Sequence, residues 1–271
     1  MPYLSPALNV MTTAARKAGR GLIRDFGEIE NLQVSLKGPA DFVSTADQRT
    51  ERILVQELSK ARPGYQFLVE ESGAIEGPDK SHRFIVDPLD GTTNFLHGVP
   101  HFAISIALER EGQLVSAVVY NPVTDEMYTA EKNHGAYLND KRLRVAARKL
   151  LKSALIVTGM PFHGREGHDQ FLAELAPIMV ATAGVRRLGS AALDLAYVAA
   201  GRFDAFWERG LSTWDVAAGI LLVREAGGEV SDLAGGPHAL EKGDILAAND
   251  TLHPQLLKML RAASVPIPKF A

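Results

Sequence analysis

Cysteine is absent from this chain of 271 residues, and its absence excludes several classes of protein. A disulfide-stabilised scaffold, a zinc ribbon, an iron–sulfur protein and an enzyme with a thiol nucleophile all depend on cysteine. The chain is long enough to bury a large core, as one domain or as two closely packed ones. Both the core and any catalytic chemistry must therefore be built without thiols.

Long hydrophobic runs and an excess of one charge are also missing. No apolar stretch approaches the roughly 20 residues that span a bilayer, and the first basic residues follow apolar positions, unlike those of a secretory signal. The chain has 29 Lys and Arg against 32 Asp and Glu, a formal charge of −3, whereas dedicated nucleic-acid binders carry a strong basic excess. With 46% hydrophobic residues, the composition favours a soluble cytoplasmic enzyme with no membrane partner and no nucleic-acid partner.

The periodicity of apolar residues divides the chain into elements. Apolar positions every three or four residues predict helices over 6–26 and from Thr45 to the Pro63-Gly64 pair, with a loop or hairpin tip at 37–41. Runs at 66–69 and 83–86, and alternation between 102 and 137, predict an antiparallel sheet. The last part is predicted to alternate strands and helices: strands 155–158, 185–188, 203–207 and 244–248, and helices 167–182, 190–200 and one beginning near Pro254. These elements predict a layered α+β fold, as one domain over 1–271 with an internal boundary near residue 152.

Acidic residues gather at three places where predicted elements begin or end. Glu70-Glu71-Ser72-Gly73 follows one predicted strand, and Asp87-Pro88-Leu89-Asp90-Gly91-Thr92-Thr93-Asn94 follows the next. Trp214-Asp215 stands at the start of an apolar helix. Carboxylates at the ends of strands are poorly placed for a core and well placed for a site. These segments are therefore the candidate functional residues.

Segment 87–94 has the residue types of a metal site beside an anion site. Asp87 and Asp90 are three residues apart around a proline turn, so they can point at one centre, and the turn frees the carbonyl of Leu89. Oxygen ligands without His or Cys favour Mg²⁺ or Mn²⁺ over Zn²⁺. Gly91-Thr92-Thr93 adds backbone N–H groups that stabilise an anion at the start of a helix. Together these groups predict phosphoryl transfer to water.

Each acidic pair taken alone has a simpler explanation. An Asp-Pro or Glu-Glu pair is usually a turn or a solvated strand end, and Asp215 would more often cap its helix. The ordered combination is more specific. Together with segments 41–47, 187–197 and 214–228, it resembles the inositol monophosphatase family, most closely the bacterial inositol-1-monophosphatase branch. The resemblance implies a five-layer αβαβα fold, a homodimer, and Mg²⁺-dependent, lithium-sensitive hydrolysis of myo-inositol monophosphates to inositol and phosphate.

The resemblance also implies a set of metal ligands. Glu70, Asp87 and the carbonyl oxygen of Leu89 would hold one Mg²⁺ ion, and Asp87, Asp90 and Asp215 would hold a second. A third, weaker site would involve Glu70, and Mn²⁺ is an alternative metal. The 1–152 half would thus be the metal-binding half and the 153–271 half the substrate-recognition half.

Catalytic and substrate-binding roles follow from the same resemblance. Thr92, hydrogen-bonded to Asp47, would act with Glu70 to orient and deprotonate the attacking water. Glu208 would accept hydrogen bonds from inositol hydroxyls, because a carboxylate can accept two O–H bonds; otherwise it is a solvated strand end. The residues expected to contact substrate are Asp90, Gly91, Thr92, Thr93, Gly189, Ser190, Ala191, Glu208 and Asp215.

Two positions and two functions stay open. Glu71 is a second-rank candidate ligand, and Lys37 either brings a cation towards the metals, as in relatives, or is an ordinary solvated lysine. The same chemistry would suit fructose 1,6-bisphosphate, histidinol phosphate or 3′-phosphoadenosine 5′-phosphate, although the match around 187–197 favours inositol phosphate or a broad specificity for phosphates of small alcohols.

The other open function is a binding role in transcription antitermination, which some bacterial members of the family also serve. The stretch 141–152 is either its docking surface or a solvated face. It carries six basic residues: Lys141, Arg142, Arg144, Arg148, Lys149 and Lys152.

Overall fold

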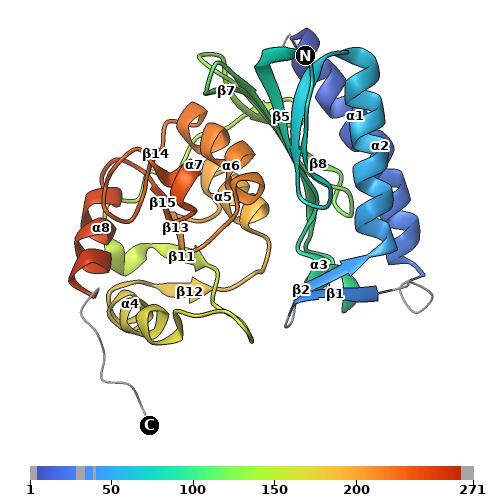
Figure 1. The fold of residues 1–271 in the computed structure, drawn as a ribbon. Helices are drawn as coiled ribbons and strands as arrows, with labels where there is room; N and C mark the ends of the chain where they lie inside the picture. Colours follow the sequence, from blue (N-terminus) through green and yellow to red (C-terminus); the bar gives the residue numbers. More distant parts are fainter. Residues whose placement is uncertain (1–4, 29–33, 39–40, 264–271) are drawn as a thin grey trace.

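The computed structural model describes the backbone of residues 5–28, 34–38 and 41–263 and the side chains of residues 5–28 and 45–263. Helices and two sheets alternate in layers across the molecule (Figure 1). Within the described residues, no helix has both the length and the apolar character needed to cross a membrane.

The first layer consists of α1 (Pro6–Phe26) and α2 (Thr45–Ala61), which pack against each other. Helix α1 begins where the Ser5 side chain accepts a hydrogen bond from the Leu8 N–H, with proline at the first helical position. Between the helices, β1 (Val34–Gly38) and β2 (Asp41–Ser44) pair as an antiparallel hairpin. The hairpin predicted at 37–41 is thus confirmed, while residues 39–40 lie outside the described residues.

The second layer is an eight-stranded sheet in the order β10-β9-β8-β7-β6-β5-β3-β4. All neighbours pair antiparallel except β3 and β5, which are parallel. The predicted meander is therefore confirmed, with one parallel pair that the alternation did not reveal. Its strands are β3 (Tyr65–Val69), β4 (Gly73–Ile75), β5 (Asp79–Asp90), β6 (Ala103–Arg110), β7 (Gln113–Asn121), β8 (Glu126–Glu131), β9 (Gly135–Leu138) and β10 (Lys141–Arg142).

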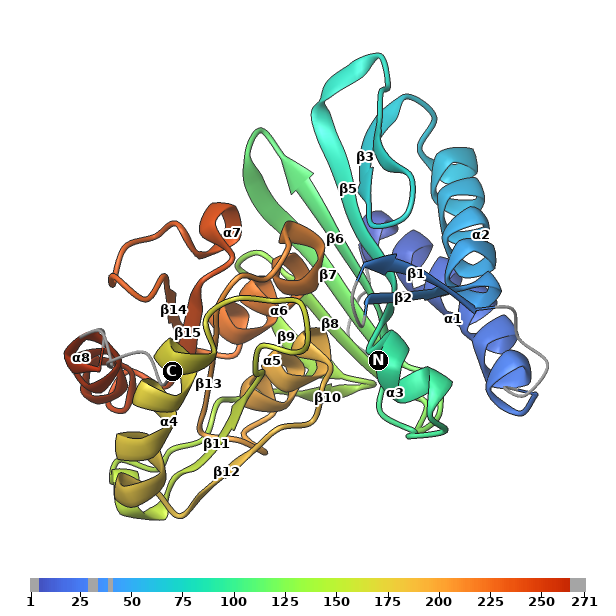
Figure 2. The same cartoon turned by 60° about the horizontal axis from the view of Figure 1, so that its bottom comes forward.

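The third layer consists of helices α5 (Ala191–Ala199) and α6 (Thr213–Glu225), which lie between the two sheets, as Figures 1 and 2 show. The fourth layer is a five-stranded mixed sheet in the order β12-β11-β13-β15-β14. Helices α4 (His168–Ala181) and α8 (His253–Ala262) form the outer layer. The strands of this sheet are β11 (Leu155–Thr158), β12 (Gly184–Arg186), β13 (Ala205–Glu208), β14 (Glu229–Ser231) and β15 (Ile245–Ala248). Three short helical segments complete the described fold: α3 (Thr92–Leu96), a 3₁₀ turn (Leu151–Ser153) and α7 (Ala239–Lys242).

Buried apolar clusters fill the spaces between these layers. One joins α1 and α2 to the large sheet, and another joins the small sheet to α4 and α8. The largest contains α5 and α6 together with residues of both sheets. The layered α+β fold and its αβαβα order are therefore confirmed. The chain leaves the large sheet after Arg142 and enters the small one at Leu155, on either side of the boundary predicted near residue 152.

Three local predictions were wrong. The strand predicted at 185–188 ends at Arg186, because Leu188 and Gly189 turn into α5, with Gly189 at a φ of +90°. The strand predicted at 203–207 runs instead from Ala205 to Glu208, which pairs with Ile245. The turn expected at Pro88 is absent, because β5 runs through it to Asp90. The register between β5 and β6 shifts between Asp87 and Asp90, which accommodates a residue that has no N–H to donate to the ladder.

Candidate active site

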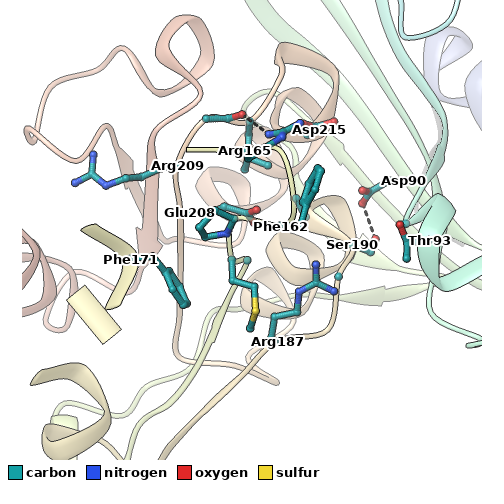
Figure 3. Close-up of a pocket in the computed structure, with 18 of the residues that line it drawn as sticks. Asp90, Thr93, Phe162, Arg165, Phe171, Arg187, Ser190, Glu208, Arg209 and Asp215 are labelled. Atoms are coloured by element: carbon teal, nitrogen blue, oxygen red, sulfur yellow. Dashed lines mark hydrogen bonds between the residues drawn. The ribbon is translucent and has the colours of Figure 1, made fainter. Parts of the chain in front are cut away.

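A cavity of about 700 Å³ lies where the two halves of the chain meet. Every residue predicted to bind metal or substrate lines it, so the fold brings together segments as far apart as Glu70 and Asp215. The catalytic candidate Asp47 is the exception, because it lies behind Thr92. Figure 3 shows Asp90, Thr93 and Ser190 on one side of this cavity and Glu208 on the other.

Asp87 and the Leu89 carbonyl sit in the irregular end of β5. The Asp87 side chain is buried, and its Oδ1 accepts a hydrogen bond from the Leu89 N–H at 2.9 Å. Burial raises the pKa of Asp87 well above its usual value, and the charges of Glu70, Asp90 and Asp215 raise it further. A hydrogen bond to Glu70, which only a protonated Asp87 can donate, acts in the same direction. These carboxylates therefore repel one another in the absence of a cation.

Asp90 is bound by the N-terminus of α5. Its Oδ2 accepts hydrogen bonds from Ser190 Oγ at 2.5 Å and from the Ala192 N–H at 2.7 Å. Burial raises the pKa of Asp90 to about 6, although these donors stabilise the ionised form and oppose the rise. The family resemblance implies that Gly189, Ser190 and Ala191 contact substrate. The structure shows that the same turn also holds a candidate metal ligand.

Asp215 has two roles at the start of α6. Its Oδ2 accepts a hydrogen bond from the Ser212 N–H at 2.7 Å, and the Ser212 side chain completes a capping box. The helix cap is therefore Ser212, and Asp215 is the third helical residue. Asp215 also lines the cavity, where burial and the charge of Asp90 raise its pKa well above the usual value. Capping and a site role are thus compatible in one side chain.

The donors in this part of the cavity suit a hard divalent cation. They are carboxylate oxygens, and Leu89, whose carbonyl is the further candidate ligand, lines the same cavity. Mg²⁺ and Mn²⁺ prefer such oxygen donors. Burial and, second to it, mutual repulsion raise the pKa values of Asp87, Asp90 and Asp215, and a cation would offset both. Among the described residues, no three His, Asp or Glu side chains already form a closed metal cage. The residues fit such a metal in the chemistry of their donors.

Thr92 and Gly91 shape the turn beside the carboxylates. Thr92 Oγ1 lies 3.0 Å from Asp47 Oδ1 and 3.1 Å from the Leu89 carbonyl oxygen, and Asp47 is fully buried. Gly91 precedes α3 at a φ of +97°, and a Cβ there would lie 3.1 Å from the His101 carbonyl oxygen. Only glycine fits easily at this position. The helix that follows spans five residues, so the anion site predicted here depends on the N–H groups of the turn.

Glu208 projects into the cavity from the end of β13. Burial raises its pKa to about 8, opposed by the charges of Arg187 and Arg165 and by a hydrogen bond from the Gly159 backbone. A Cβ atom at Gly159 would lie 1.9 to 2.1 Å from the Glu208 carboxylate. Residue 159 must therefore be glycine for Glu208 to take this position.

Sequence reasoning missed several residues that line this side of the cavity. Arg165, Arg187 and Arg209 are the cationic ones, and Glu174 is a buried acidic one. None lies in an acidic motif, and the helical periodicity of α4 gives no sign of a buried carboxylate. Glu71, by contrast, does not line the cavity, and its N–H donates to Glu51 Oε2 at 2.8 Å. Lys37 lies in β1, but its side chain is outside the described residues.

The chain is similar to known proteins over nearly all of its length. It is 63% identical to the inositol-1-monophosphatase of Mesorhizobium japonicum, over 95% of this chain and 97% of that protein. It is 47% identical to the Nus factor SuhB of Pseudomonas aeruginosa, over 95% and 97%. The crystal structure of the extragenic suppressor protein suhB from Bartonella henselae superimposes with a TM-score of 0.93 at 57% identity, covering 95% of this chain and 99% of that one.

The sequence model that describes the inositol monophosphatase family matches residues 4–265. Fold, cavity and sequence agree, because the carboxylates of the family's characteristic segment are the ones that line the cavity. The chain belongs to the inositol monophosphatase family.

Proposed function

We propose that this protein is a Mg²⁺-dependent phosphatase that hydrolyses myo-inositol monophosphates to inositol and phosphate. The observation that carries this proposal is that a single cavity is lined by several carboxylates with the Leu89 carbonyl and also by Glu208, which Figure 3 shows apart from Asp90. The carboxylates suit a cation and the phosphate that it binds, and Glu208 suits a hydroxylated ring. The name of the Mesorhizobium relative supports the same substrate.

Two or three Mg²⁺ ions would be held by Glu70, Asp87, the Leu89 carbonyl, Asp90 and Asp215, as the family resemblance assigns them. When bound, Mg²⁺ supplies positive charge to phosphate and leaving-group oxygens and lowers the pKa of bound water. Mn²⁺ would serve with the same ligands.

The chain's own residues orient the reactants. Thr92, whose hydroxyl lies within hydrogen-bonding distance of Asp47, would act with Glu70 to hold the attacking water and accept its proton. The N–H groups of Gly91, Thr92 and Thr93 would bind phosphate oxygens. Gly189, Ser190 and Ala191 would border the ring, and the Glu208 carboxylate would accept hydrogen bonds from its hydroxyls.

The test is phosphate release by the purified protein with Mg²⁺ from a panel of monoesters. Inositol 1-phosphate should give the highest kcat/KM, and Asp90→Asn should reduce it by about 100-fold or more, because a charged metal ligand is lost. Asp140→Asn, which changes an exposed aspartate, is the matched control and should behave as wild type. A strong preference for fructose 1,6-bisphosphate, histidinol phosphate or 3′-phosphoadenosine 5′-phosphate would instead support those substrates.

A homodimer is also proposed, with α4 at its interface. Leu172, Met179 and Val180 are 55%, 56% and 90% exposed and fall on one side of this helix. An exposed apolar stripe of this kind marks an interaction surface. Val180→Glu should therefore shift the molar mass measured by light scattering from dimer to monomer, and an unchanged mass would exclude this interface.

A second candidate function is binding within a transcription complex, which the name of the Pseudomonas relative favours. The basic residues of 141–152 are exposed, although Arg148 also bonds to the buried Asp204 at 3.1 Å. Replacing Lys141, Arg142 and Arg144 by serine should abolish recovery of transcription proteins from cell extract while phosphate release persists. If the wild type recovers no transcription protein from the extract, this function is excluded.

We further propose that the protein is cytoplasmic and that Li⁺ inhibits it. Phosphate release measured in LiCl and in NaCl would detect the inhibition.

A further inference from the structure

The strand that carries Glu208 is fixed from its opposite face. Successive side chains of a strand point to opposite sides, so Trp207 points away from the side that Glu208 occupies. Arg209 follows the last residue of the strand, and its bond to Glu174 places it towards α4 as well. Trp207 packs in the cluster that α4 and α8 cover, whereas Phe206, on the same side as Glu208, belongs to the cluster between the sheets. Both neighbours of Glu208 therefore face α4.

One carboxylate on α4 binds both neighbours. Glu174 is 1% exposed. Its Oε1 accepts hydrogen bonds from Arg209 Nε at 2.7 Å and Gln170 Nε2 at 2.8 Å, and its Oε2 lies 3.3 Å from Trp207 Nε1. Because Glu174 binds the residue before and the residue after Glu208, it restricts rotation of the strand end between them.

Arg209 extends the same network to the next strand. Its Nη1 donates to Asp244 Oδ2 at 3.0 Å, and Asp244 Oδ1 accepts from the Gly210 N–H at 3.1 Å. Asp244 directly precedes β15, whose Ile245 pairs with Glu208. The Glu208 carboxylate itself lies beside Gly159, where no Cβ would fit. The strand end is thus fixed through its two neighbours, and the carboxylate occupies the space that Gly159 leaves.

A buried ion pair of this kind contributes little net stability, because desolvation offsets the attraction between the charges. Its geometry nevertheless defines one orientation of the strand end. We propose that Glu174 is a positioning residue that, through Trp207 and Arg209, holds Glu208 towards the hydroxyls of a polyol phosphate. It would thereby set the preference for such substrates over phosphate esters without ring hydroxyls. This inference rests on the proposed function of the same cavity.

The experiment compares inositol 1-phosphate with p-nitrophenyl phosphate, which carries no ring hydroxyls. For Glu174→Gln, the KM for inositol 1-phosphate should rise about tenfold with kcat nearly unchanged, as when an outer partner of a functional group is lost. The kcat/KM for p-nitrophenyl phosphate should stay within about twofold of wild type. Asp169→Asn, an exposed carboxylate on the same helix, is the matched control and should leave both substrates unaffected.

A double-mutant cycle separates positioning from a structural role. If Glu174 acts through Glu208, Glu174→Gln should raise the KM by less than about twofold in a Glu208→Gln background, because the effects of coupled residues do not add. If Glu174→Gln does not fold, Arg209→Gln replaces it in the test. Arg209→Gln must then raise the KM for inositol 1-phosphate and leave the kcat/KM for p-nitrophenyl phosphate unchanged. Arg209→Lys should bring that KM part of the way back to the wild-type value.

Four outcomes would overturn this inference. Equal losses with both substrates, or an undiminished effect in the Glu208→Gln background, would overturn the inference and leave the proposed function intact. The same holds if Glu174→Gln keeps the wild-type preference. If the wild type itself does not prefer inositol 1-phosphate to the aryl phosphate, the proposed function fails and this inference fails with it.

Discussion

Residue 159 is glycine, so no side chain occupies the space beside Glu208. The nearest atoms to a Cβ at this position would be those of the Glu208 carboxyl group, at 1.9 to 2.1 Å. These atoms end a flexible side chain, so an added methyl group would displace Glu208 before it disturbed the backbone. Gly159 is therefore tied to the orientation of Glu208.

Gly159→Ala should therefore affect substrate choice more than folding. We expect the KM for inositol 1-phosphate to rise about tenfold, as for other losses of support around a functional group, with a small change in the Tm. Steady-state kinetics and thermal unfolding of the same preparation measure the two quantities. A large fall in Tm with an unchanged KM would show that the methyl group displaces the backbone instead.

Asp194 is a second residue whose setting has a measurable consequence. Its carboxyl oxygens are buried with no hydrogen-bond partner among the described residues, and the nearest titratable contact, His101 Nε2, is 3.9 Å from Oδ1. Burial lowers the pKa of His101 to about 4 and raises that of Asp194 well above its usual value. The two residues are therefore not an ion pair at neutral pH.

Asp194→Asn should stabilise the protein, and more so at high pH. When folding raises the pKa of a carboxyl group, the free energy of unfolding of the protein falls as the pH rises from the unfolded pKa of that group through its folded pKa. Asparagine does not ionise, so we expect a gain in the free energy of unfolding on the order of 1 kcal/mol that is larger at about pH 8 than at about pH 5. Urea unfolding at both pH values measures it, and an equal gain at the two would contradict the titration.

At the scale of elements, the start of α5 joins the two halves of the site. Ser190 is the N-cap of this helix, and its hydroxyl also bonds to Asp90, which is 100 positions away in the sequence. The α5 backbone donates to the same carboxylate through Ala192. An anion is stabilised at this end of a helix, so α5 helps to keep Asp90 ionised for a cation.

Ser190→Ala should accordingly weaken both folding and metal use. Loss of the N-cap costs about 1 kcal/mol, and loss of a hydrogen bond to a metal ligand should raise the Mg²⁺ concentration for half-maximal activity about tenfold. Ser190→Thr keeps the hydroxyl and should recover both. A variant with lower Tm and unchanged Mg²⁺ dependence would limit Ser190 to capping.

At the scale of the whole molecule, the cavity depends on contact between the two sheets and the helices between them. The largest apolar cluster includes Ile85 of the eight-stranded sheet and Phe206 of the five-stranded sheet, with α5 and α6 between them. This shared core supports the prediction that residues 1–271 form one domain, which stays a prediction. Because the halves meet at the carboxylates, a cation there should stabilise the whole fold.

Mg²⁺ should therefore raise the Tm of protein stripped of metal with EDTA. A ligand that binds only the folded state at about 100 times its Kd stabilises by about 2.7 kcal/mol per site. Asp90→Asn should reduce the shift, and Asp140→Asn should keep it. An equal shift for wild type and Asp90→Asn, measured by calorimetry, would place the stabilising cation elsewhere.

The sequence by itself determined the main helices and most of the strands, the layered class and the types and order of the acidic residues. Those features are local: periodicity follows from the geometry of each element, and residues 87–94 carry their oxygen donors within one short segment. Only the tertiary structure decided that Ser190 holds Asp90, that Gly159 makes room for Glu208 and that Glu174 faces Trp207 and Arg209. Each of these pairs joins residues at least 33 positions apart, so no local pattern could reveal them. They arise only when burial of the shared core brings the two sheets and their helices together.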